Sequence, residues 1–189
     1  MTQLSNLILL DACCLLNLYA TGRMRDIAEA LSHRLAVVDY VLEEEALFVW
    51  GSLGGESREK PVLVDLSPWV TEGLIQILRL EHQGEEENFV DLAALIDDGE
   101  AMTGALAQYR GCALATDDRK ARRILAERAP TVQLISTLDL LKQWADQSSI
   151  SRADLRAAMS AMQSGASYIP GDQDSLFEWW RSIMSGDTR

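Results

Sequence analysis

The feature that most constrains the fold of this chain is an apolar run that ends on a single carboxylate. Residues 7–16 read LILLDACCLL, so a strand pattern is followed by Asp11 and then by a helical pattern. A second run of this design, ALATDDRKARRIL at residues 113–125, leads into Asp117 and Asp118. Continuous apolar runs that precede helices are typical of buried parallel strands. Because open α/β sheets bind ligands at the carboxyl ends of their strands, we expect these acids to gather at one sheet edge.

Composition favours a cytoplasmic protein without a membrane segment. The chain has 189 residues, of which 48% are hydrophobic, and it can bury one substantial core. Asp11 interrupts the one stretch that approaches the length of a membrane span, and the first ten residues carry no Lys or Arg, unlike a secretion signal. Three cysteines, two of them adjacent at Cys13 and Cys14, and two histidines make neither a disulfide framework nor a zinc pattern.

Charge is distributed unevenly along the chain. The formal net charge of −12 argues against broad binding of duplex nucleic acid and suits a basic protein partner. The acids concentrate between residues 81 and 100, whereas basic side chains cluster beside the aspartate doublet at Arg119, Lys120, Arg122, Arg123 and Arg128. Beside a bound metal, such a local basic strip can hold a phosphodiester.

Strand and helix patterns alternate along the chain, which predicts a layered α/β domain with helices on both faces of a mainly parallel sheet. We expect strands at residues 7–11, 35–38, 112–116 and 132–135, and extended pieces at 62–65 and 74–80. We expect helices at residues 13–20, 23–34, 85–96, 99–109, from 118 onward, 137–145, 151–163 and 172–185, and around Val41 to Glu45. The polar, glycine-rich residues 51–61 are typical of a mobile loop.

Each acid also has an ordinary structural explanation. Asp11 can be a polar residue that leaves a strand, and Asp117 or Asp118 can be an N-cap. The acids at 43–45 can form a solvated helix face, and Glu100 can complement a helix dipole. The ordered set of acids is harder to explain in this way than any one member.

The set resembles the PIN domain family of metal-dependent nucleases over roughly residues 5–145. The resemblance rests on four segments: LILLDACCLLNL at the amino end, VVDYVLEEE at 37–45, GEAMTGALA at 99–107 and ATDDRKAR at 115–122. The segment STLDLLKQW at 136–144 is similar to the G-T-L-x-L-L segment of one PIN subgroup, with Ser136 in place of the glycine. The resemblance implies a three-layer PIN-like fold.

The resemblance also implies a site made of acids. Its catalytic residues would be Asp11, Glu44, Glu100, Asp117 and Asp118. All of them except Glu44 would bind metal, and the family's spacing from Val41 selects Glu44 over its two acidic neighbours. Carboxylates packed together repel unless a cation neutralises them, and ligand sets made of oxygen alone favour Mg²⁺ or Mn²⁺ over zinc.

Three residues around the doublet are expected to bind substrate: Thr116, Arg119 and Arg122. Thr116 either orients a carboxylate or contacts phosphate, and an ordinary strand-end hydroxyl is an equally good explanation. The arginines belong to a basic strip whose members cannot all share one helix face, so only one or two of them meet phosphate.

The chain departs from the family pattern in three places. The third acid is glutamate rather than the commoner aspartate, residues 46–80 form a longer segment than compact PIN toxins have, and a helical tail follows residue 151. We therefore expect a nuclease domain at residues 1–146 and a helical extension at 147–189. Apolar stripes in this extension predict that it packs on the core or on a dimer partner.

The implied function is a divalent-metal-dependent ribonuclease that cuts RNA internally, commonly the toxin of a toxin–antitoxin pair. The expected partners are an RNA substrate, a cognate antitoxin protein and a second copy in a homodimer. Two alternatives stay open: a PIN-like module that binds RNA or protein without cutting, and a phosphohydrolase for small phosphate esters. Against the phosphohydrolase, residue 13 is cysteine, so Asp11 lacks the D-x-D arrangement of aspartyl phosphatases.

Overall fold

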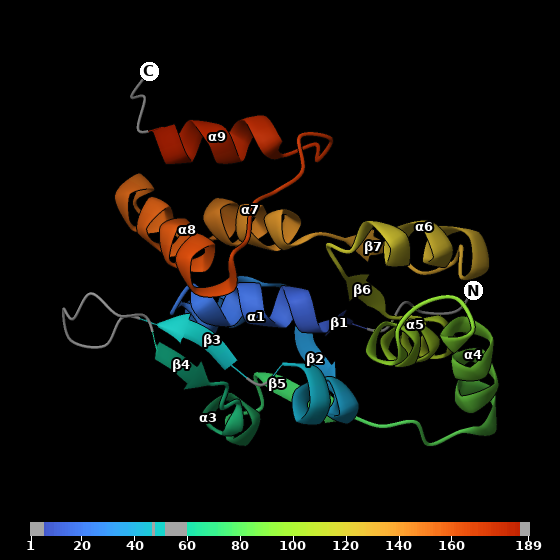
Figure 1. Ribbon diagram of the computed structural model, residues 1–189. Coiled ribbons are helices and arrows are strands. Elements are labelled where there is room, and N and C mark those ends of the chain that lie inside the picture. Colours follow the sequence, from blue (N-terminus) through green and yellow to red (C-terminus); the bar gives the residue numbers. More distant parts are fainter. Residues whose placement is uncertain (1–5, 47, 52–59, 186–189) are drawn as a thin grey trace.

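The computed structural model describes residues 6–46, 48–51 and 60–185, and its centre is a parallel sheet (Figure 1). This sheet has five strands in the order β5-β2-β1-β6-β7. They are β1 (Leu7–Leu10), β2 (Arg34–Val38), β5 (Ile75–Leu78), β6 (Ala113–Ala115) and β7 (Leu134–Ile135). All neighbouring pairs in the sheet are parallel, as the sequence predicted.

Strand β1 lies at the centre of the sheet because all of its residues are apolar and buried. Leu10, its last residue, is in register with Val37 of β2 and with Ala115 of β6. The three strands therefore end at the same edge. The residues that follow β1 and β6, Asp11 and Thr116, begin the candidate site.

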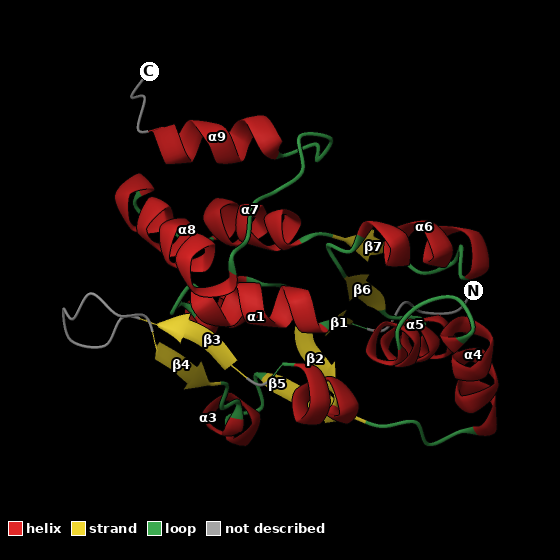
Figure 2. Cartoon of the chain, in the orientation of Figure 1, coloured by secondary structure: helices red, strands yellow, loops and turns green. Residues whose placement is uncertain are grey.

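Helices cover both faces of the sheet and complete a three-layer α/β fold (Figure 2). One layer contains α1 (Ala12–Ala20), α2 (Met24–Ala30), α7 (Thr137–Gln147) and α8 (Arg152–Ala166). In this layer α1 contacts the other three helices. The other layer contains α4 (Gln83–Ala93) and α5 (Asp98–Arg110), and α5 packs on β1, β2 and β6. Helix α6 (Arg119–Arg128) connects β6 to β7.

Several elements differ from the sequence prediction, and the last predicted helix begins at Phe177 and not at residue 172. Helix α2 ends at Ala30, because Leu31 has an extended backbone and leads toward β2. Residues 48–63, expected to contain a loop, include an antiparallel pair of strands, β3 (Phe48–Gly51) and β4 (Lys60–Leu63). Most of the predicted mobile loop, residues 52–59, lies outside the described residues. Two short helical segments flank the pair, η1 (Val41–Glu45) and α3 (Ser67–Thr71).

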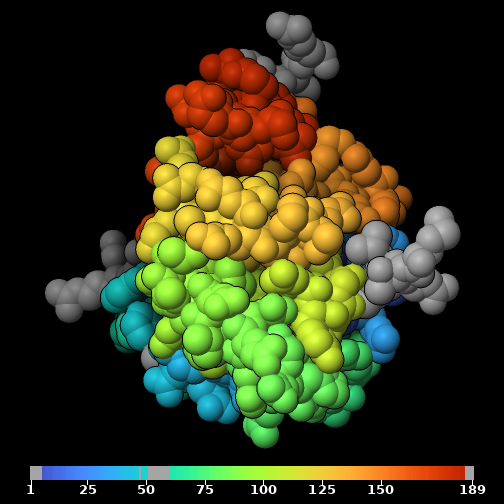
Figure 3. Space-filling model, turned by 90° about the vertical axis from the view of Figure 1, so that its right-hand side faces the viewer, coloured from blue at the N-terminus to red at the C-terminus, as the bar shows by residue number. Residues whose placement is uncertain are grey.

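The C-terminal helices pack on the rest of the chain. Helix α8 contacts α1 and β3, and its apolar stripe joins the main core through Leu155, Ala158, Met159 and Met162. Helix α9 (Phe177–Ser185) packs on α8 and is the outermost layer (Figure 3). Among the residues that the structure describes, no helix is long and apolar enough to cross a membrane.

Candidate active site

Asp11 begins the site directly after β1. It is the N-cap of α1, where its Oδ1 accepts a hydrogen bond from the Cys14 backbone N–H at 2.8 Å. Only 4% of Asp11 is exposed, and this burial raises its pKa. Hydrogen bonds from Thr116, Cys14 and Cys13 oppose the shift, and the Asp117 charge adds to it. An N-capping role and a metal-binding role are therefore both open to this carboxylate.

Asp117 is held by side chains from two distant helices. Its Oδ1 accepts from the Thr137 backbone N–H at 2.9 Å, and its Oδ2 accepts from the Thr137 hydroxyl. The Asn17 amide donates to the same Oδ2 at 3.0 Å. No pattern in the sequence indicated a role for Thr137 in the site, although this residue lies in the STLDLLKQW segment that carried part of the resemblance.

The second aspartate of the doublet has a different environment. Asp118 is exposed and caps α6, because its Oδ1 accepts from the Ala121 backbone N–H at 2.7 Å. Thr116 lies between the acids: its Oγ1 accepts from the Asp118 backbone N–H, and its hydroxyl bonds Asp11. Thr116 is only 1% exposed, and its two bonds hold the Asp11 carboxylate and the Asp118 backbone, which agrees with the expected role of orienting a carboxylate.

The structure brings Glu45, and not Glu44, to the acids. Glu44 is exposed, whereas Glu45 lies so close to Gly99 that a Cβ atom at position 99 would be 2.1 Å from its Oε2. Burial raises the pKa of Glu45, and the charge of Asp11 contributes to that shift. The cause of the difference is local geometry. Residues 41–45 form a π-helix, and its wider turn places Glu45, the fourth residue after buried Val41, on the inward side while Glu44 is exposed.

Glu100 lies in the first turn of α5, at the edge of the same group of acids. Burial raises its pKa to about 7, the charges of Asp118, Asp97 and Asp11 add to the shift, and a hydrogen bond from the Asp97 backbone opposes it. Like charges thus interact across segments that are far apart in the sequence. The acids of this site, hereafter the acid cluster, are Asp11, Glu45, Glu100, Asp117 and Asp118.

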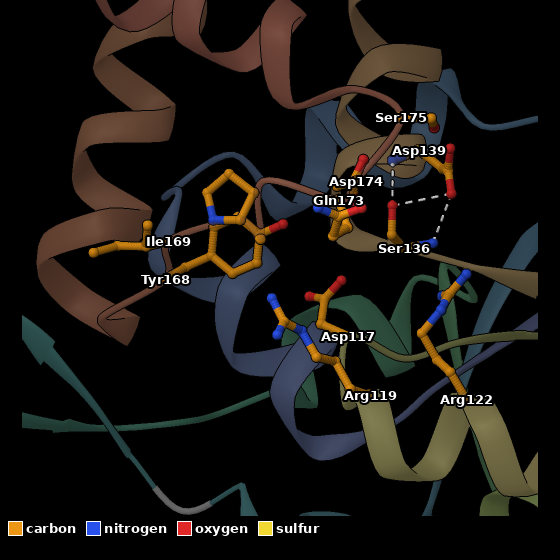
Figure 4. Close-up of a pocket in the computed structure, with 12 residues that line it drawn as sticks. Asp117, Arg119, Arg122, Ser136, Asp139, Tyr168, Ile169, Gln173, Asp174 and Ser175 are labelled. Atoms are coloured by element: carbon orange, nitrogen blue, oxygen red, sulfur yellow. Dashed lines mark hydrogen bonds between the residues drawn. The ribbon is translucent and has the colours of Figure 1, made fainter.

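A cleft of about 640 Å³ opens beside Asp117 (Figure 4). Both predicted substrate arginines line it. Arg122 is already engaged, because its Nη1 donates to the Thr116 and Ile135 carbonyl oxygens at 2.8 and 2.9 Å and joins the ends of β6 and β7. Arg119 is exposed and has no hydrogen bond or ion pair with any other described residue.

Comparison with known families identifies this arrangement. A family model described as a PIN domain matches residues 7–173. The chain belongs to the PIN domain family. The match includes α8 and therefore extends beyond the segments that carried the resemblance in the sequence. Searches of curated proteins and of solved structures gave no match.

PIN domains are generally nucleases that use divalent metals. The acid cluster of this PIN domain offers carboxylate oxygens as ligands for such an ion, and burial together with neighbouring like charges raises the pKa values of Asp11, Glu45 and Glu100. Among the residues that the structure describes, the one group with three potential ligand atoms within 4.8 Å of one another consists of the Asp11 carboxylate and the sulfur atoms of Cys13 and Cys14. Burial raises the pKa of Cys14 well above its usual range, which keeps this thiol protonated and favours a hard, oxygen-preferring cation.

Proposed function

We propose that this PIN domain is a divalent-metal-dependent endoribonuclease that uses Mg²⁺ or Mn²⁺. The observation that carries the proposal is the charge coupling between acids of distant segments: Asp11 follows β1, Asp118 lies just beyond β6, and both charges add to the burial that raises the pKa of Glu100 in α5 to about 7. Such a group of acids destabilises the fold unless it serves a ligand, since each charge is repelled by its neighbours.

The chain's own residues have distinct tasks in this proposal. Asp11, Glu45, Glu100 and Asp118 supply oxygens for the cation. Thr116 orients the Asp11 carboxylate and holds the Asp118 backbone. Asn17 and Thr137 fix the Asp117 carboxylate at the mouth of the cleft. When bound, the cation lowers the pKa of a water molecule and stabilises negative charge on the phosphodiester.

We further propose that the protein acts as the toxin of a toxin–antitoxin pair and works as a homodimer. The net charge of −12 supports a basic protein partner. If a neighbouring gene encodes a small basic protein, its co-expression should suppress RNA cleavage. Light scattering of the purified chain should give the mass of two copies.

A second candidate is a PIN module that binds RNA or protein without cutting. The observation in its favour is that both oxygens of Asp117 already accept hydrogen bonds from Thr137. A carboxylate engaged in this way has less capacity left for a metal ion.

Incubation of the purified protein with end-labelled RNA in Mn²⁺, Mg²⁺ or EDTA separates the two candidates. The nuclease proposal predicts internal cleavage products with either metal and intact RNA in EDTA. Calorimetric titration with Mn²⁺ runs in parallel on the same sample. Metal binding without any cleavage would favour the binding module and contradict the nuclease.

A further inference from the structure

One wall of the cleft beside Asp117 is formed by residues that do not belong to the acid cluster. This wall is the 168–175 loop, which joins α8 to α9. The opposite wall comes from the start of α6 and from Ser136 and Asp139 at the start of α7. In Figure 4, Asp117 lies between Arg119 and Arg122 and faces the loop.

Arg119 is held at this wall without a charged partner. A Cβ atom at position 171 would lie 2.5 Å from a guanidinium nitrogen of Arg119, so this side chain packs directly on the Gly171 backbone. No carboxylate or carbonyl of the described residues bonds the guanidinium. Its donors are therefore directed at the cleft and free to bind an anion.

Tyr168 provides a second free donor in the cleft. It is only 8% exposed, yet its hydroxyl makes no hydrogen bond with any residue in the described part of the chain. Burial raises the pKa of the phenol well above its usual range, and the Asp117 charge adds to the shift. The hydroxyl thus stays protonated and available as a donor near Asp117.

The other acids of the cleft each accept hydrogen bonds from their own segment. Asp139 Oδ2 accepts from the Ser136 backbone N–H at 2.8 Å and from its hydroxyl at 3.0 Å. Asp174 Oδ1 accepts from the Leu176 backbone N–H at 2.8 Å. Neither acid pairs with Arg119, so the guanidinium and the Tyr168 hydroxyl remain as donors for an anionic ligand.

We propose that the 168–175 loop completes an RNA subsite, in which Arg119 and Tyr168 bind the phosphate of a nucleotide adjacent to the one cleaved at the acid cluster. This inference rests on the proposed ribonuclease function. The cleft volume of about 640 Å³ is in the range of pockets that hold ligands of nucleotide size. The tail then contributes to substrate binding as well as to packing.

Fluorescence anisotropy of a short, labelled, single-stranded RNA tests the subsite. The protein carries Glu100→Gln, which keeps the RNA intact, and the buffer contains Mg²⁺. We expect Arg119→Gln to weaken binding about tenfold and to reduce the slope of log affinity against log salt by about 0.7, the value for one lost phosphate contact on single strands. Tyr168→Phe should weaken binding about fivefold and leave the slope unchanged, because it removes one neutral donor.

Two further variants serve as controls. Arg128→Gln makes the same charge change on α6. Arg128 follows Arg119 by nine residues and therefore lies on the opposite side of the helix, so this variant should leave the affinity unchanged. Gly171→Ala should weaken binding without any change of charge, because the added methyl group displaces the Arg119 guanidinium. Thermal melts show whether each variant is as stable as its parent.

Equal weakening by Arg119→Gln and Arg128→Gln would overturn the subsite in favour of general electrostatic attraction. Unchanged affinity in folded Arg119→Gln and Tyr168→Phe proteins would overturn it as well, and leave the nuclease proposal standing if the wild-type chain cleaves RNA. Failure of the Glu100→Gln parent to bind RNA, with no cleavage by the wild type, would overturn both proposals.

Discussion

The acid cluster should reduce the stability of the metal-free protein, and Glu100→Gln should recover part of the loss. The glutamine keeps the shape of the side chain and removes its charge. The pKa of Glu100 rises from 4.5 to about 7 in the folded state. For a fully desolvated group this shift is worth about 3 kcal/mol. Because Glu100 is only half-buried, solvent screening reduces the expected gain to about 1–2 kcal/mol.

The sign of this effect sets its pH dependence. A raised folded-state pKa means that the folded protein holds a proton which the unfolded chain has already released. The free energy of unfolding of the wild type therefore decreases as the pH rises from about 4.5 to about 7. Glu100→Gln has no carboxyl group at this position and does not show that decrease. The variant should be more stable than the wild type at pH 8, and the difference should be less than half as large at pH 5.

Urea denaturation at pH 8 and pH 5 in EDTA measures this difference, with Glu86→Gln on the exposed face of α4 as the control. In thermal melts at pH 8, we expect a rise of roughly 3–6 °C for Glu100→Gln. Mn²⁺ should stabilise the wild type and have little effect on the variant, because a cation that binds the folded state shifts the equilibrium toward it. A variant that is less stable than the wild type at pH 8, or a gain that is equal at both pH values, would refute the reasoning.

Three other predictions follow from the packing. Glu45→Gln should reduce the rate of metal-dependent RNA cleavage at least tenfold and Glu44→Gln less than twofold, since Glu45 packs on Gly99 and Glu44 is exposed. Equal effects of the two substitutions would contradict the assignment of Glu45 to the acid cluster. Glu85→Ala should cost about 2 kcal/mol at pH 7 in urea denaturation, because buried Glu85 bonds Arg110 Nε at 2.6 Å; an unchanged midpoint would contradict this. Truncation after residue 147 should cause aggregation in size-exclusion chromatography, since it uncovers the α1 surface beneath α8; a soluble monomer of full stability would count against it.

Much of the fold could be predicted because it depends on local patterns. The apolar runs that become β1 and β6 each end on an acid, and parallel pairing in register brings those ends together. The alternation of these runs with helical patterns was sufficient to predict a parallel sheet between layers of helices. The β3–β4 pair was missed because its sequence surrounds a polar stretch that is typical of a loop.

The details of the site were less predictable, for physical reasons. The family's spacing from Val41 favoured Glu44, whereas in the π-helix at residues 41–45 Glu44 is exposed and Glu45 packs against Gly99. Thr116 was expected either to orient a carboxylate or to contact phosphate, and only its burial and its bond to Asp11 in the folded chain favour the first role. Tyr168 lies in the tail and reaches Asp117 only through tertiary packing, so no local pattern in the sequence indicated it.

The rate of RNA cleavage by Asp11→Asn, compared with the wild type in Mn²⁺, tests the central claim most directly. Asparagine is as good an N-cap as aspartate, so α1 and the fold should survive the change. We expect internal cleavage by the wild type, none by the wild type in EDTA, and at least a hundredfold loss of rate in folded Asp11→Asn protein. Cleavage at the wild-type rate by folded Asp11→Asn would contradict the assignment of the acid cluster as the active site.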